Sequence, residues 1–147
     1  MEDRYYTPKI EEFHVGFEYE QHEIINECDP HWKMMVKKMG FSRKEINKVF
    51  YNVDLIENLN QERIRVKYLD KEDVESLGFK LKVENEYGIV FANRLYSIVC
   101  SKMKNNHLEI FLIQPYINEY DGLKFSGIIK NKSELKKLLI QLEIINE

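Results

Sequence analysis

The chain has 147 residues and a formal net charge of −3, with 44% hydrophobic and 32% charged residues. This length suits one domain with its own hydrophobic core, and nine tyrosines and eight phenylalanines argue against intrinsic disorder. The sequence pI near 5.9 is too low for a general nucleic-acid-binding protein, so any such role would need a local basic patch.

Cysteine content and hydropathy predict the cellular location. Cys28 and Cys100 are too few for a disulfide framework. The polar start of the chain lacks the apolar run of a signal peptide, and no apolar stretch reaches the roughly 20 residues that a membrane helix needs. We therefore expect a cytoplasmic protein with reduced thiols and no membrane contact.

Charge is distributed very unevenly in the first third of the chain. Residues 1–30 contain nine acidic and two basic residues, a formal charge of −7. Residues 31–48 contain six basic residues and one acidic residue, a formal charge of +5. Clustered charge of this kind governs the choice of partner and the rate of encounter more than the fold, and it indicates binding to a charged macromolecule.

Apolar and polar residues alternate from Glu12 to Glu20. This period of two predicts a half-buried strand with an anionic outer face. The apolar positions are Phe13, Val15, Phe17 and Tyr19. A second strand is expected over residues 32–36. A capping box at Ser42 and Glu45 then predicts a helix, with Ile46, Val49 and Phe50 on its buried side.

The second half of the chain predicts an antiparallel meander. A strand with a basic outer face is expected over residues 63–68, followed by a short helix with Asp70 as its N-cap and Gly78 at its end. The strands of the meander are expected at residues 79–83, 88–92, 95–102, 108–114 and 124–130. Asn93-Arg94 and Asn105-Asn106 are expected as two-residue connections.

Two features indicate how the meander is covered. The strands at 95–102 and 108–114 are apolar at both parities, which is typical of central strands covered on both faces. Asn131 predicts the N-cap of a last helix, whose leucines recur with helical spacing and would pack on the sheet. The leucines are Leu135, Leu138, Leu139 and Leu142. We expect one α+β domain over residues 1–147, with an antiparallel sheet of about five or six strands and two or three helices.

Catalytic and metal-binding patterns are weak. His22, Cys28 and His31 are zinc-type ligands, but zinc modules usually show two ligand pairs and only Cys28-x-x-His31 is present. Cys100 lies in an apolar strand and is interpreted as a buried, unreactive thiol. There is no glycine-rich phosphate loop and no nucleophile elbow. We therefore expect a non-enzymatic protein without a cofactor or a metal.

Two charged surfaces are the candidate binding sites. The first is the acidic face, which could imitate a phosphate backbone and occupy a basic nucleic-acid channel of a partner protein. It comprises Glu12, Glu18, Glu20 and Glu23. The second is the basic helix, which could touch the partner or its bound RNA or DNA. It comprises Lys37, Lys38, Arg43, Lys44 and Lys48. Either surface could instead be an ordinary solvated face.

Two blocks resemble the ends of small uncharacterised proteins from phages and other mobile elements. They are YYTPKIEEFHVGFEYE (residues 5–20) and FSGIIKNKSEL (residues 125–135). The resemblance implies a provenance and no functional residues. A compact, acidic-faced protein of that provenance would often be an inhibitor of host defence, such as an anti-CRISPR protein.

These observations lead to one hypothesis and two alternatives. The hypothesis is a phage-encoded inhibitor of a host nucleic-acid-targeting defence enzyme, acting through the acidic face and the basic helix. One alternative is a toxin-neutralising immunity protein, which would use a similar acidic surface. The other is a small metal-dependent enzyme that uses His22, Cys28 and His31. The sequence leaves the oligomeric state open.

Overall fold

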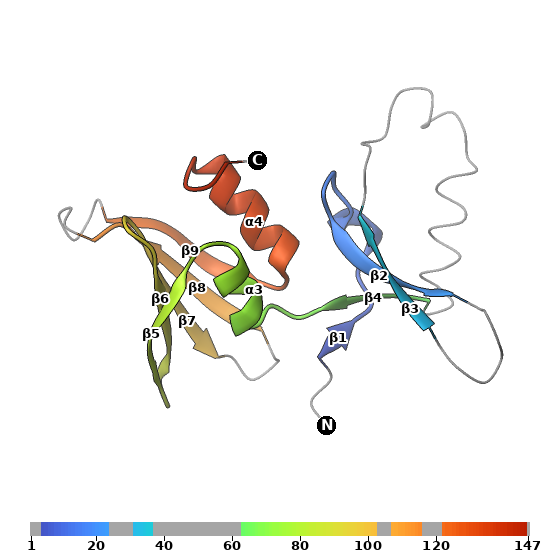
Figure 1. Cartoon of the computed structure of the whole chain (residues 1–147), viewed down its shortest axis with the longest axis horizontal. Helices are drawn as coiled ribbons and strands as arrows, with labels where there is room; N and C mark the ends of the chain where they lie inside the picture. Colours follow the sequence, from blue (N-terminus) through green and yellow to red (C-terminus); the bar gives the residue numbers. More distant parts are fainter. Residues whose placement is uncertain (1–3, 24–30, 37–62, 103–106, 116–121, 147) are drawn as a thin grey trace. The chain divides into compact units, whose positions relative to one another are not determined.

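The computed structural model describes residues 4–23, 31–36, 63–102, 107–115 and 122–146 (Figure 1). These residues form two antiparallel sheets and a few short helices, so the predicted α+β class is confirmed. The chain divides into two compact units, Asp3–Lys67 and Tyr68–Glu147. The single domain over residues 1–147 stays a prediction.

The first unit contains a four-stranded sheet with the order β1-β4-β2-β3. Its strands are β1 (Tyr5–Tyr6), β2 (Glu18–Glu23), β3 (His31–Val36) and β4 (Ile64–Lys67). The buried core of this unit consists of Phe13, Phe17, Ile64 and Val66. The expected strands at residues 32–36 and 63–68 are confirmed, and β4 shows the predicted alternation of buried and half-buried residues.

The prediction of a strand from Glu12 to Glu20 is wrong for its first part. Ile10–Glu12 form a short 3-10 helix, η1, and Gly16 has a φ of +86°. This left-handed conformation suits a glycine in a turn and breaks an extended strand. The strand therefore begins only at Glu18, in β2.

The apolar residues that alternate before β2 lie in and around a turn, not in a strand. Phe13 and Phe17 are buried with their ring centroids 4.8 Å apart, whereas Val15 between them is 59% exposed. Tyr19 adds a third ring, 5.2 Å from Phe13 in an edge-on arrangement. Aromatic packing thus explains the same spacing that a half-buried strand would produce.

The second unit is the predicted meander, a five-stranded sheet with the order β5-β6-β7-β8-β9. Its strands are β5 (Lys80–Asn85), β6 (Gly88–Ala92), β7 (Ser97–Lys102), β8 (Leu108–Ile113) and β9 (Leu123–Ile129). Two helices, α3 (Lys71–Ser76) and α4 (Lys132–Gln141), pack against one face of this sheet (Figure 1). The C-terminal helix on the sheet is therefore confirmed.

The helix caps of the second unit follow the sequence signals. Asp70 Oδ1 accepts a hydrogen bond from Asp73 N at 3.0 Å, and Asn131 Oδ1 accepts one from Glu134 N at 2.9 Å. These bonds satisfy backbone donors that the first turn of a helix leaves unpaired. Gly78, just after α3, has a φ of +95°, as expected for a helix-ending glycine.

The two faces of the meander differ. Ile98, Cys100, Ile110 and Leu112 are fully buried against the helices, whereas Phe111 on the opposite face is half-buried. Complete covering of both faces is therefore not seen within the described residues of this unit.

The structure describes one of the two predicted two-residue connections and not the other. The prediction of a two-residue connection at Asn93-Arg94 is wrong, because β6 ends at Ala92 and β7 begins at Ser97. Asn93 Oδ1 accepts hydrogen bonds from the backbone N–H groups of Leu95 and Tyr96 instead. Asn105-Asn106 and the helix expected from Ser42 lie outside the described residues.

Candidate functional site

The four-stranded sheet of the first unit has one face against its aromatic core. We call the opposite face the outer face. Strand register and period-two alternation assign one set of residues to it. This set comprises Tyr5, Glu18, Glu20, His22, Trp32, Met34, Val36, Arg65 and Lys67. The outer face thus combines aromatic, cationic, anionic and apolar side chains.

Arg65 is the centre of the outer face. Its guanidinium carbon lies 3.9 Å from the centroid of the Tyr5 ring and 4.1 Å from that of the Trp32 ring. Its Nε donates a hydrogen bond to Glu20 Oε2 at 2.5 Å, between strands whose Cα positions are directly paired. Two cation–π contacts and a charge-assisted hydrogen bond therefore connect Arg65 on β4 to residues of the three other strands of the sheet.

His22 extends this cluster along β2. Its ring lies 5.2 Å from the Trp32 ring in an edge-on arrangement with an interplanar angle of 68°. Trp32 is directly opposite His22 in the β2–β3 pairing. His22 is thus a packing partner of Trp32. We call the set Tyr5, Glu20, His22, Trp32 and Arg65 the arginine–aromatic cluster.

The four predicted glutamates do not form one row. Glu12 lies on η1, where its carboxylate accepts hydrogen bonds from the Tyr6 hydroxyl at 2.8 Å and from Lys9 N at 2.6 Å. Its carboxylate is thus engaged within the segment from Tyr6 to Glu12. Glu20 belongs to the arginine–aromatic cluster.

The other two glutamates lie on β2 at positions of different parity. Glu18 is paired with Val36 on the outer face. Glu23 is paired with His31, a position assigned to the other face by the alternation along the strand. The structure therefore brings together only Glu18 and Glu20 of the predicted acidic face.

Of the two basic surfaces expected from the sequence, the structure describes only the one on β4. Residues 37–48, with the predicted basic helix, lie outside the described part of the chain. The basic strand face is described, and there the charge of Arg65 is offset by Glu20. Arg65 thus balances one carboxylate of β2 within the same chain.

The candidate metal ligands are not assembled in the described residues. His22 is opposite Trp32, and His31 is opposite Glu23, so the two histidines occupy positions of opposite parity. Cys28 lies outside the described residues. Across the described ranges, no group of three or more His, Cys, Asp or Glu side chains is placed to hold a metal ion.

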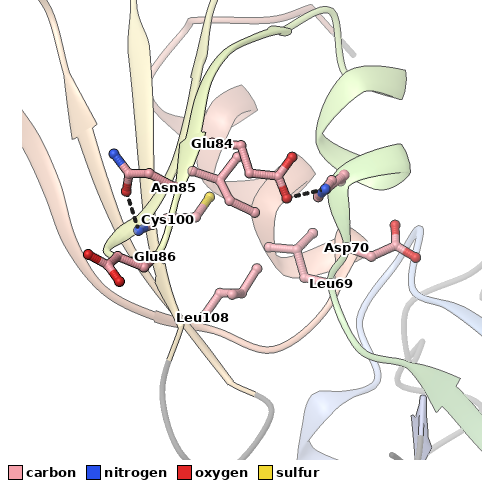
Figure 2. A pocket seen from close by; sticks show the side chains of 10 residues that line it. Leu69, Asp70, Glu84, Asn85, Glu86, Cys100 and Leu108 are labelled. Atoms are coloured by element: carbon pink, nitrogen blue, oxygen red, sulfur yellow. Dashed lines mark hydrogen bonds and ion pairs between the residues drawn. The ribbon is translucent and has the colours of Figure 1, made fainter.

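The second unit has a pocket of about 310 Å³ beside the start of α3 (Figure 2). Leu69, Ile89, Cys100 and Leu108 form its apolar part. Its rim carries Asp70, Lys71, Glu84, Asn85, Glu86 and Gly88. The volume is at the lower end of the range for small-molecule sites.

The polar groups of this pocket are largely engaged within the protein. Lys71 forms an ion pair with Glu84, and Asn85 Oδ1 accepts a hydrogen bond from the N–H group of Gly88 (Figure 2). Asn85 Oδ1 also accepts a hydrogen bond from the N–H group of Tyr87. Burial raises the pKa of the Cys100 thiol to about 12, so the thiol is protonated at neutral pH. The pocket therefore contains no activated thiolate nucleophile, in line with the inert interpretation of Cys100.

Comparisons with family models, curated proteins and solved structures find no match to this chain. Among the described residues, no helix has the length and apolar character needed to cross a membrane. The candidate site therefore rests on the residues of the outer face alone.

Sequence reasoning missed the arginine–aromatic cluster. The basic alternation around Arg65 is visible in the sequence, but nothing there singles out Tyr5 and Trp32 among the aromatic residues as its partners. The sequence does not show that β4 lies between β1 and β2. This strand order brings Arg65 close to both Tyr5 and Trp32. Such pairing joins residues far apart in the chain and leaves no local signal.

Proposed function

We propose that this chain is a small non-enzymatic binding protein whose partner is another protein. The outer face of the four-stranded sheet is the proposed interface, and the single observation that carries the proposal is the arginine–aromatic cluster. Tryptophan, tyrosine and arginine dominate the energetic centres of protein interfaces. Here Arg65 is held in contact with both Tyr5 and Trp32 before any partner arrives.

Exposed apolar side chains next to the cluster support the same proposal. Met34 is 60% exposed and Val36 is 43% exposed, and both belong to the outer face. Methionine is enriched at protein interfaces, and apolar area there would be buried when a partner binds.

The balance of charge favours a protein partner over nucleic acid. The outer face carries Glu18 and Glu20 beside Arg65 and Lys67, with Arg63 at the same parity just before β4, and Glu20 pairs directly with Arg65. Binding to phosphates gains most of its affinity from uncompensated cations that release counterions. The carboxylate of Glu20 at the centre of the face opposes that mode of binding.

The proposal extends to the class of partner. Residues 1–30 contain nine acidic and two basic residues. This negative charge suits a partner with a basic, nucleic-acid-binding surface. The protein would then act as a phage-encoded inhibitor of a nucleic-acid-targeting defence enzyme. Support for this step comes from charge and from the resemblance of the two terminal blocks.

Capture of the partner from a lysate of the natural host tests the proposal. The tagged protein, its Trp32→Ala variant and a Val15→Ala control are compared, with nuclease treatment and elution by a salt gradient. Val15 is an exposed apolar residue of the same unit that lies on a turn outside the outer face. Circular dichroism checks that each variant is folded.

The proposal predicts that a partner protein is captured even after nuclease treatment. The captured amount should fall at least tenfold with Trp32→Ala and stay unchanged with Val15→Ala. A basic nucleic-acid enzyme among the captured proteins would support the finer proposal. Capture that depends on nucleic acid, or equal capture by both variants, would overturn the proposed interface.

A further inference from the structure

The sheets end in edge strands of very different character. β1 has only two residues. β5 carries Lys80, Lys82 and Glu84, and its register shifts between Leu81 and Val83. β9 begins opposite a second register shift and carries Lys124. Short length, charges and bulges are the usual devices that prevent an edge from pairing with another strand.

β3 has none of these devices except one charge. Its six residues pair with β2 without a register shift, from His31 to Val36. Lys33 is its only lysine, arginine or acidic residue, and Met34 and Val36 are exposed. Among the described residues, no strand pairs with the other side of β3. A regular, mostly apolar edge of this length is suited to strand addition.

We propose that two copies of this protein pair through β3, as antiparallel edge strands related by a two-fold axis at Met34. An axis perpendicular to the sheet keeps the outer faces of both copies on the same side. Residues of even number must then face residues of even number, because directly opposed side chains share a face.

The self-pairing centred on Met34 is complementary at every position from residue 32 to residue 36. Met34 faces its own copy, and Trp32 faces Val36, an aromatic and β-branched pair of the kind that stabilises sheets. Lys33 faces Met35, so no like charges are opposed. All five residues of this segment take part.

The neighbouring registers are less favourable. Centring the pair on Lys33 would oppose two ammonium groups and leave Val36 without a partner in β3. Centring it on Met35 would remove Trp32 and Lys33 from the pairing. The sequence of β3 therefore selects one register, and the dimer would join two outer faces into one continuous surface.

The oligomeric state of the purified protein tests this inference without any partner. Sedimentation velocity over a wide concentration range is expected to show a monomer–dimer equilibrium. Met34→Lys places two ammonium groups opposite each other and should weaken dimerisation at least tenfold. Val15→Lys adds the same charge at a similarly exposed site outside β3 and should leave it unchanged. A monomer at every concentration, or equal effects of both variants, would overturn the inference.

Cysteine cross-linking tests the register. In a Cys28→Ser background, Met34→Cys places two thiols directly opposite each other, at a Cα separation that a disulfide can span. Val36→Cys places each thiol opposite Trp32 instead. Mild oxidation is expected to give a covalent dimer with Met34→Cys and little with Val36→Cys. Equal cross-linking of both variants, or none with Met34→Cys, would rule out this register.

Discussion

The guanidinium carbon of Arg65 lies 4.1 Å from the centroid of the Trp32 ring, and Trp32 is the only tryptophan of the chain. The fluorescence of this residue therefore reports directly on the arginine–aromatic cluster. The same contact links β4 to the edge strand β3 across β2, so it holds the outer face together as well as shaping it.

Arg65→Ala should change the tryptophan spectrum and lower the stability of the first unit. Two cation–π contacts are lost, each worth about 0.5–1 kcal/mol, and Glu20 loses its ion-pair partner. We expect the free energy of unfolding to fall by about 1–2 kcal/mol, with a shifted Trp32 emission maximum. Arg94→Ala, the same change at an exposed arginine of the second unit, is the control. An unchanged emission spectrum in Arg65→Ala would contradict the described contact.

Glu12→Lys should destabilise the protein, because its carboxylate accepts hydrogen bonds from the Tyr6 hydroxyl and from Lys9 N. Losing charge-assisted bonds of this kind costs about 1–3 kcal/mol in the free energy of unfolding, measured by urea denaturation. Glu11→Lys makes the same change at an exposed neighbour and should cost less than about 0.5 kcal/mol. Equal stability of the two variants would restore Glu12 as a candidate binding residue.

The elements that the sequence predicted well are those with local signals. Asp70 and Asn131 cap their helices as expected, because an N-cap depends only on residues within one turn. The meander strands were found from their apolar runs and the turn residues between them, since consecutive strands in a meander pair with their sequence neighbours.

The first unit was harder to predict because its contacts are long-range. β4 pairs with β1 and β2, which lie far earlier in the chain, so neither the four-stranded sheet nor its outer face has a local signature. The alternation around Val15 could equally arise from a strand or from a turn that buries two aromatic rings. The φ of Gly16 separates these two possibilities, and a sequence does not specify it uniquely.

Gly88→Ala should disrupt the pairing of β6 with β7. A Cβ atom at this position would lie 2.5 Å from the carbonyl oxygen of Cys100, so the backbone of one strand must shift. We expect a loss of more than about 2 kcal/mol in the free energy of unfolding, measured by denaturation followed by circular dichroism. A small loss would mean that the two strands are farther apart.

Gly78→Ala is the matched control for that variant. Nothing lies within 4 Å of a Cβ atom at Gly78, but its φ of +95° is unfavourable for alanine. The cost should be only about 1 kcal/mol, because it arises from backbone strain alone. Gly88 has no positive φ, so the cost of its substitution is steric, whereas the cost at Gly78 is conformational. A cost at Gly88 no greater than that at Gly78 would contradict the expected clash.

Cys100 should make stability decrease in alkaline solution. Burial raises the pKa of its thiol from 9.0 to about 12 in the folded protein, so only the unfolded chain loses this proton between these values. The unfolded state then binds fewer protons, and the free energy of unfolding falls as pH rises above 9.0, by at most about 1.4 kcal/mol per pH unit.

Urea denaturation at several alkaline pH values measures this slope, with Cys100→Ala as the reference for all other titrating groups. The wild-type protein should lose stability more steeply than the variant above pH 9.0 and in parallel with it below that value. The native thiol should also react with a soluble disulfide reagent far more slowly than the thiol of the unfolded chain, because it is both buried and protonated. Parallel pH profiles throughout would show that Cys100 reaches solvent in the folded protein.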